Sequence, residues 1–263
     1  MDTPDIKTMV RERYGSIATG DTASCCAPAT SCCSPARPAD VHDRARRMGY
    51  SDAELAAIPD GANLGLGCGN PQAIAALRPG EVVIDLGSGA GFDCFLAARQ
   101  VGPSGHVIGV DMTHEMLAKA RDNAARIGAD NVEFRLGELE HLPVADNTAD
   151  AILSNCVINL VPDQAQVFRE AFRVLKPGGR LAISDVVNTS PLSDDLKGDA
   201  DLICGCVVGA APVDRVESWL AAAGFHQIQV TIKPESRDLI ASWAPGRGIE
   251  DHVASASIEA RKP

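Results

Sequence analysis

The chain has 263 residues, of which 45% are apolar and 22% are charged, so it has the composition of a folded globular protein and not of a disordered one. Its formal net charge of −11 would repel phosphate groups. This argues against nonspecific nucleic-acid or anionic-membrane partners and favours a small, neutral or cationic ligand. No apolar run approaches the ~18 residues of a membrane helix and the first residues do not resemble a secretion signal, so we expect a cytoplasmic protein.

The first 79 residues are expected to form an N-terminal extension with little regular structure. Helix-forming residues predict short helices near residues 5–14 and 41–48. Between them, residues 24–35 are small, rich in cysteine and interrupted by proline, which predicts a loop. Residues 61–71 hold so many glycines that we expect a close-packed loop beside the substrate or another backbone segment.

From residue 80 onward, predicted strands alternate with predicted helices. Strands are expected at 82–86, 106–111, 132–136, 151–156 and 181–187, a turn at 176–179, and helices at 92–100, 116–127, 164–175 and 214–223. The alternation indicates an α/β fold with right-handed βαβ units and a doubly wound, mostly parallel sheet of about seven strands. Two late strands, 226–233 and 252–259, lack an evident crossover helix, so we expect an antiparallel hairpin at one edge. One domain is therefore expected over residues 80–263, with a substrate-covering insertion at about 188–213.

A glycine-rich loop, DLGSGAG at residues 85–91, follows the first predicted strand and opens a helix. Asp111 lies at the end of the second strand, 20 residues beyond Gly91, where a carboxylate can accept hydrogen bonds from ribose hydroxyls. Together they indicate an adenosine-containing cofactor. A dinucleotide fingerprint would have glycine where Phe92 stands, and Asp85 would repel a pyrophosphate. The alternatives are a glycine turn that serves only packing and an NAD-dependent oxidoreductase.

The segment 85–91 resembles the first motif of class I methyltransferases, which have a Rossmann-like fold. The resemblance implies S-adenosylmethionine as cofactor, because its ammonium group suits Asp85. It also implies that the methionine part lies over the glycine loop, the ribose on Asp111 and the adenine near Met112. The cofactor-binding residues expected on this basis are Asp85, Gly87, Ser88, Gly89, Gly91, Asp111, Met112, Gly137, Glu138 and Asn155.

Nine cysteines are unevenly distributed, and without a secretion signal reduced thiols are expected. Three of them lie on segments that should line the rim of the cofactor cleft, beyond the carboxyl ends of the strands. Cys156 ends the fourth strand, Cys68 lies in the glycine-dense loop, and Cys206 lies in the insertion. Thiolates bind soft ions, and these spacings match no zinc-ribbon pattern. Trivalent arsenic binds three sulfur ligands in a pyramid and keeps a lone pair that can attack a methyl group. Three cysteines at the rim of the cofactor cleft would provide these three ligands.

Three segments resemble signature segments of the arsenite S-adenosylmethionine methyltransferases, namely LGCGNP at 66–71, SNCVINLVPD at 154–163 and GCVVGA at 205–210. The similarity extends over most of the chain. It implies methylation of trivalent arsenic, as arsenite or a thiol conjugate, with Cys68, Cys156 and Cys206 as arsenic ligands. It also implies an N-terminal cysteine that acts by disulfide exchange, and the choice among Cys25, Cys26, Cys32 and Cys33 stays open.

Methyl transfer leaves the arsenic oxidised, so a thiol reductant, glutathione or thioredoxin, is expected as a co-substrate. The expected partners are arsenite and methylated arsenicals, with thioredoxin as a further candidate, and neither nucleic acid nor a membrane. Cys94 is expected to serve packing, and Cys204 matches no family thiol. Two other functions stay open: a methyltransferase acting on carbon or oxygen of a small metabolite, which leaves the rim cysteines unexplained, and a thiol-rich metal-binding module built on the four N-terminal cysteines.

Overall fold

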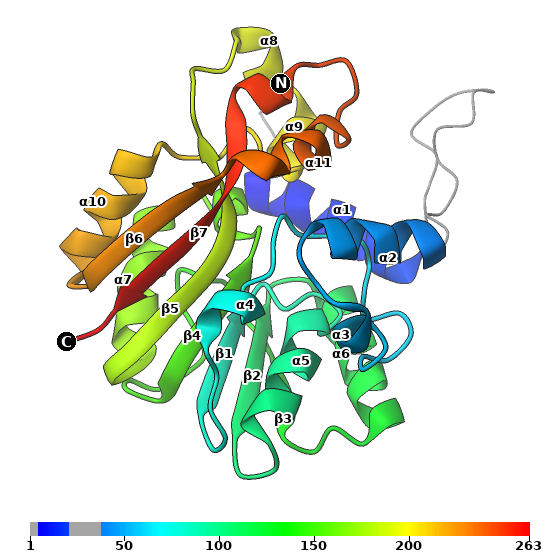
Figure 1. Cartoon of the computed structure of the whole chain (residues 1–263), viewed down its shortest axis with the longest axis vertical. Coiled ribbons are helices and arrows are strands. Elements are labelled where there is room, and N and C mark those ends of the chain that lie inside the picture. Colours follow the sequence, from blue (N-terminus) through cyan, green and yellow to red (C-terminus); the bar gives the residue numbers. More distant parts are fainter. Residues whose placement is uncertain (1–4, 21–37) are drawn as a thin grey trace.

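The computed structural model describes residues 5–20 and 38–263. The loop expected at 24–35, with Cys25, Cys26, Cys32 and Cys33, lies outside the described residues. Within them, one seven-stranded sheet has the strand order β3-β2-β1-β4-β5-β7-β6 (Figure 1). Its strands are β1 (Val82–Leu86), β2 (His106–Asp111), β3 (Val132–Leu136), β4 (Ala149–Asn155), β5 (Leu175–Asn188), β6 (His226–Lys233) and β7 (Val253–Arg261).

Strands β1 to β5 pair in parallel, whereas β7 pairs antiparallel with both β5 and β6. The predicted fold class, a doubly wound and mostly parallel sheet with an antiparallel edge, is therefore confirmed. One local prediction is wrong, because the turn expected at 176–179 lies inside β5. Leu175 already pairs with Ala149, and the register then shifts before Arg180 pairs with Ala151. Pairing with a neighbouring strand overrides the local turn preference and turns the extra residues into a bulge.

Helices cover both faces of the sheet. One face packs against α5 (Phe92–Val101) and α6 (His114–Ile127), with a core that includes Val83, Val107 and Leu153. The other face packs against α7 (Gln164–Val174) and α10 (Val213–Ala223). A parallel sheet that is buried on both faces needs nearly continuous apolar strands, which explains why the short apolar runs were recognisable in the sequence.

The remaining elements gather mostly around the carboxyl ends of the strands (Figure 1). They are α1 (Ile6–Thr19), α2 (Pro38–Arg47), α3 (Asp52–Leu55), α4 (Gln72–Ala75), η1 (Ile158–Leu160), α8 (Asp194–Lys197), α9 (Ala200–Cys204), η2 (Pro234–Ser236), α11 (Arg237–Ala241) and η3 (Ile249–Asp251). Helix α1 contacts α6, α9 and η1, so it bridges the two halves of this end of the sheet. None of the described helices is both long and apolar enough to cross a membrane.

Candidate functional site

A cavity of about 760 Å³ lies at the carboxyl ends of β1, β2 and β4. The glycine loop, α1, the loop at 62–67 and the segment around α9 all contribute to its wall. The lining includes most of the residues expected to bind the cofactor, namely Asp85, Gly87, Ser88, Gly89, Asp111, Met112, Gly137 and Asn155. Gly91 and Glu138 do not belong to the lining. Open α/β sheets bind their ligands at this edge, so the cavity lies where the topology predicts a site.

The glycine loop has a conformation that a larger residue cannot adopt. Gly87 has a φ of 69°, and a Cβ atom there would lie 2.5 Å from Cγ2 of Val157. Gly91 has a φ of 92°, and a Cβ atom there would meet the rings of Phe95 and Phe134, so this glycine serves the packing of α5 on the sheet. The loop also holds a buried hydroxyl group, that of Ser88, without a hydrogen-bond partner among the described residues. An unpartnered buried polar atom in a cavity wall is a place for a polar ligand group.

Two carboxylates, those of Asp85 and Asp111, line the cavity beside the glycine loop. Asp85 is buried, and the Sγ atom of Cys94 donates a hydrogen bond to it over 3.1 Å. Burial raises the pKa of Asp85 well above its ordinary value, so a positively charged ligand group would relieve the cost of its charge. Asp111 accepts hydrogen bonds from the backbone N–H groups of Gly89 (2.9 Å) and Thr113 (2.8 Å), which fastens the glycine loop to the end of β2.

Glu138 fastens helix α1 beside the cavity. Its carboxylate lies 2.6 Å from Lys7 Nζ and 2.6 Å from Arg11 Nη2, and Lys7 also reaches Glu140 at 2.9 Å. The hydrogen bond from Lys7 lowers the pKa of Glu138. These contacts tie α1 to the loop that follows β3. Because Lys7 and Arg11 already pair with the charge of Glu138, this carboxylate needs no ligand to neutralise it.

Three cysteines from separate segments meet at one end of the cavity, and we call Cys68, Cys156 and Cys206 the thiol cluster. The Sγ atoms of Cys68 and Cys156 lie within 4.8 Å of each other. Cys206 Sγ also lies 2.9 Å from the carbonyl oxygen of Cys156. Cys68 and Cys206 are each 2% exposed, and Cys156 is half-buried. Cys156 and Cys206 line the cavity, whereas Cys68 does not belong to the lining. The structure thus brings together the three cysteines that the sequence analysis selected.

The backbone of the thiol cluster is unusual. Cys156, directly after β4, has a φ of 58°, and Cys206, two residues after α9, has a φ of 64°. Residues other than glycine rarely adopt this left-handed conformation, and when they do they often lie at functional sites. A hydrogen bond from the Cys156 N–H group to the Ser184 carbonyl oxygen (2.8 Å) helps to hold the turn.

The thiols of this cluster favour the protonated form. Burial raises the pKa of Cys68, and the hydrogen bond with Cys206 raises that of Cys156. The hydrogen bond with Cys156 lowers the pKa of Cys206, but burial and neighbouring charges outweigh it. A soft ion that binds here therefore displaces protons from the sulfurs.

The amide group of Asn155 holds the backbone at Cys68. Its Oδ1 atom accepts the N–H of Cys68 (3.0 Å), and its Nδ2 atom donates to the carbonyl oxygen of Gly69 (2.8 Å). The Nδ2 atom also donates to the hydroxyl of Tyr50 (3.1 Å), which in turn donates to Asp93 Oδ1 (2.8 Å). Burial raises the pKa of Asp93 to about 6. Sequence reasoning found Asn155 but not its partners Tyr50 and Asp93, which are far from it along the chain.

Asp185 on β5 is a further residue that sequence reasoning missed. One of its carboxylate oxygens lies within 4.8 Å of the sulfur atoms of Cys68 and Cys156. Burial raises its pKa to about 7, and hydrogen bonds from surrounding N–H groups oppose that rise. The signal in the sequence was an acidic residue inside an apolar strand, since charged residues are rarely buried without a partner.

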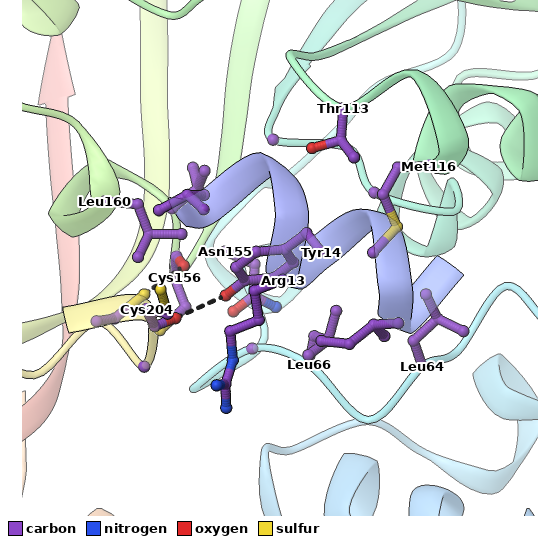
Figure 2. Close-up of a pocket in the computed structure, with 18 of the residues that line it drawn as sticks. Arg13, Tyr14, Leu64, Leu66, Thr113, Met116, Asn155, Cys156, Leu160 and Cys204 are labelled. Atoms are coloured by element: carbon purple, nitrogen blue, oxygen red, sulfur yellow. Dashed lines mark hydrogen bonds between the residues drawn. The ribbon is translucent and has the colours of Figure 1, made fainter. Parts of the chain in front are cut away.

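The two other described cysteines border the site. Figure 2 shows Tyr14 of α1 directed at Cys204, with Cys156 and Leu160 beside it. The Tyr14 hydroxyl donates to the carbonyl oxygen of Cys204 over 3.2 Å, so the contact is with the backbone and not with the thiol. Cys94 on α5 packs in the core between this helix and the sheet, as expected, and its thiol donates a hydrogen bond to Asp85.

The chain is similar to known methyltransferases. Residues 77–224 match the family model of a methyltransferase domain. The whole chain is 52% identical over 275 residues to an arsenite methyltransferase of Halobacterium salinarum and covers 68% of that protein. It is 50% identical over 166 residues to an arsenite methyltransferase of Aquipseudomonas alcaligenes, an alignment that covers 60% of this chain and 47% of that relative. A solved arsenic(III) S-adenosylmethionine methyltransferase from Chlamydomonas reinhardtii superimposes with a TM-score of 0.58 at 30% identity, covering 86% of this chain and 74% of that one.

Proposed function

The chain belongs to the arsenite methyltransferases, and we propose that it transfers the methyl group of S-adenosylmethionine to trivalent arsenic bound by Cys68, Cys156 and Cys206. The observation that carries the proposal is that three cysteines from separate segments lie together: the sulfur of Cys68 is within 4.8 Å of that of Cys156, and Cys206 Sγ lies 2.9 Å from the Cys156 carbonyl oxygen. Cys156 and Cys206 line the cavity that the glycine loop also lines. Arsenite or a thiol conjugate of it would exchange its ligands for the protein thiols. Cores that bury cysteine only for packing have no reason to gather three thiols at a cavity.

The cavity fits the proposed cofactor, which supplies an electrophilic methyl group on a positively charged sulfur. The buried carboxylate of Asp85 suits a cationic group, and the unpartnered hydroxyl of Ser88 suits a polar one. Asp111 is the proposed acceptor for the ribose hydroxyls, and the volume of about 760 Å³ is in the range of small-molecule sites. The residues that we assign to the cofactor are Asp85, Gly87, Ser88, Gly89, Asp111, Met112 and Gly137, with Gly91 and Glu138 supporting them through packing and ion pairs. Asn155, which the sequence analysis also expected to bind the cofactor, we assign to the support of Cys68, because its amide bonds the backbone at Cys68 and Gly69.

The protein contributes mainly by holding the arsenic. The lone pair of trivalent arsenic is a nucleophile that carries no proton, so the reaction needs no general base. Burial of Cys68 and Cys206 keeps water away from two of the proposed ligands. Holding two reactants in an attack geometry replaces an encounter in solution and can supply a large part of the rate enhancement.

We propose that the two parts of the chain have different roles in the reaction. Residues 1–79 would supply the Cys68 ligand and an N-terminal cysteine that reduces the arsenic by disulfide exchange, with glutathione or thioredoxin as the final reductant. Residues 80–263 would form the methyltransferase domain, with the insertion at about 188–213 supplying Cys206. The cytoplasm is the compartment in which such thiols stay reduced.

The proposed function is tested by incubating the purified protein with arsenite, a thiol reductant and cofactor labelled in its methyl group. We expect the label in methylated arsenic species, separated by chromatography, and none when arsenite is omitted. The same assay with quinone or phenol acceptors tests a carbon or oxygen methyltransferase. Labelled organic product with no labelled arsenical would reject the proposal, and a metal-binding module would label neither.

A further inference from the structure

A buried carboxylate lies directly behind the thiol cluster. Asp185 is 2% exposed, and one of its oxygens lies within 4.8 Å of the sulfur atoms of both Cys68 and Cys156. Unlike Cys156 and Cys206, it does not belong to the cavity lining. Two of the three thiols, those of Cys156 and Cys206, therefore lie at the wall of the space that the cofactor is proposed to fill, whereas this carboxylate lies outside that space. Burying a charge is costly, so a buried carboxylate at such a place calls for a physical reason.

The hydrogen-bond partners of Asp185 favour its charged form. Its carboxylate accepts the backbone N–H of Val186 (2.7 Å), the side-chain Nδ2 of Asn159 (2.9 Å) and the backbone N–H of Ile158 (3.0 Å). All of these groups are neutral amide donors, and a carboxylate that accepts from several donors is stabilised in its ionised state. No lysine or arginine in the described parts of the chain forms an ion pair with it. These donors only partly offset the burial that raises the pKa of Asp185 to about 7, so near neutral pH part of the carboxylate is ionised, with no ion pair to neutralise its charge.

The proposed reaction moves a positive charge onto the arsenic. The arsenic lone pair forms a bond to the methyl carbon while the bond from that carbon to the sulfonium sulfur breaks, and the bonding electron pair stays on that sulfur. The sulfur becomes a neutral thioether. Arsenic bound to three thiolates is neutral before the step and becomes a cationic arsonium after it, with no proton exchanged.

We propose that the Asp185 carboxylate stabilises the positive charge as it forms on the arsenic, and so accelerates methyl transfer without being an arsenic ligand. This inference rests on the proposed function. Only interactions that are stronger in the transition state than in the ground state raise the rate. Because Asp185 lies behind the thiols and away from the cavity, it is nearer to the charge after transfer than before it.

A purely structural role is the rival interpretation. The same hydrogen bonds tie η1, which follows Cys156, to β5, and Asn159 also donates to the carbonyl oxygen of Val186 (2.6 Å). A residue that only fixes this turn would support the position of Cys156. Its loss would weaken arsenite binding and methyl transfer together. In the electrostatic role, loss of the charge would slow methyl transfer without weakening arsenite binding, because a negative charge beside thiolates does not favour their binding of arsenite.

The test compares D185N with N159A and the wild type. D185N removes the charge at nearly constant volume and keeps an oxygen acceptor for the donors of Asn159 and Val186. N159A is the matched control, because it removes one donor to the carboxylate and one bond to Val186 but leaves the charge. We would measure the single-turnover rate of the first methyl transfer with saturating cofactor, and the arsenite Kd by equilibrium dialysis with arsenic counted by mass spectrometry.

We expect the rate in D185N to fall on the order of 100-fold, the lower end of the range seen when a preorganised electrostatic partner is removed from other active sites, with the arsenite Kd unchanged or lower. N159A should unfold at a lower temperature but keep most of the rate. An unchanged rate in D185N, or a rate loss matched by weaker arsenite binding, would overturn the inference. If D185N does not fold, Asp185→Ser, which leaves room for water, provides the same two measurements. A wild-type protein that forms no methylarsenical would reject the proposed function itself.

Discussion

At the scale of single residues, we propose that Asn155 supports the arsenic ligands and that Asp111 binds the cofactor. Both line the cavity, but their hydrogen bonds point to different parts of it. Asn155 uses both ends of its amide on the backbone at Cys68 and Gly69, whereas Asp111 uses both oxygens on the backbone around the glycine loop. Replacing each in turn should therefore affect one ligand more than the other.

Asn155→Ala should weaken arsenite binding more than cofactor binding. The substitution leaves the N–H of Cys68 and the carbonyl of Gly69 without their partner, and a lost buried hydrogen bond costs about 1 to 3 kcal/mol, or roughly 10- to 100-fold in affinity. Equilibrium dialysis with arsenite and calorimetric titration with the cofactor measure the two constants. The reverse pattern would make Asn155 a direct cofactor contact and not a support for Cys68.

Asp111→Ala should have the opposite selectivity. It removes the proposed acceptor for the ribose and the anchor of Gly89, so cofactor affinity should fall by roughly 10- to 100-fold, because hydrogen bonds to charged groups are worth about 1.5 to 3 kcal/mol. The arsenite Kd should barely change. Calorimetric titration checks the cofactor constant, and an unaltered value would remove Asp111 from its assigned role.

At the scale of elements, a buried hydrogen-bond network joins α5 to the segments before the sheet. Asp93 on α5 accepts hydrogen bonds from Tyr50 (2.8 Å) and Asn155 (3.3 Å), and Gln72 donates to its backbone carbonyl (2.8 Å). Tyr50 also packs edge-on against Phe92 at a centroid distance of 4.7 Å. The loop that carries Cys68 is thus held against the first crossover helix by polar contacts as well as by packing.

This network should make stability depend on pH. Burial raises the pKa of Asp93 to about 6, above its value in the unfolded chain, so its stabilising contribution is complete at low pH and is lost as pH rises through about 6. Relative to D93N, which keeps an acceptor for Tyr50, the wild type should lose about 1 kcal/mol of unfolding free energy between about pH 5 and pH 7.5. Urea unfolding of both proteins measures this difference. A difference between them that stays constant with pH would contradict the assignment.

At the scale of the whole molecule, the parallel sheet was predictable because its strands are short, apolar and separated by helices. The bounds of β1, β2, β3 and β6 agree with the sequence prediction to the residue. The bulge in β5 could not be predicted, since pairing with β4 decides it and not the local turn residues. The same reasoning applies to the site. The rule that ligands bind at strand ends selected Cys156, but nothing local connects Asp185 or Tyr50 with it.

The central claim is that the thiol cluster holds the arsenic that is methylated, and Cys156→Ser tests it most directly. Cys156 adjoins both other cysteines of the cluster, with its sulfur within 4.8 Å of that of Cys68 and its carbonyl oxygen 2.9 Å from Cys206 Sγ. Serine is similar in size but binds soft arsenic far less well. Cys204→Ser is the matched control, because only the backbone carbonyl of Cys204 accepts the bond from Tyr14.

The deciding measurement is the formation of labelled methylarsenicals from arsenite by the two variants and the wild type, with cofactor binding and thermal unfolding recorded for each. The account predicts that Cys156→Ser forms none while it still binds cofactor and unfolds near the wild-type temperature, and that Cys204→Ser retains activity. Methylation of arsenite by a folded Cys156→Ser protein at the wild-type rate would contradict it.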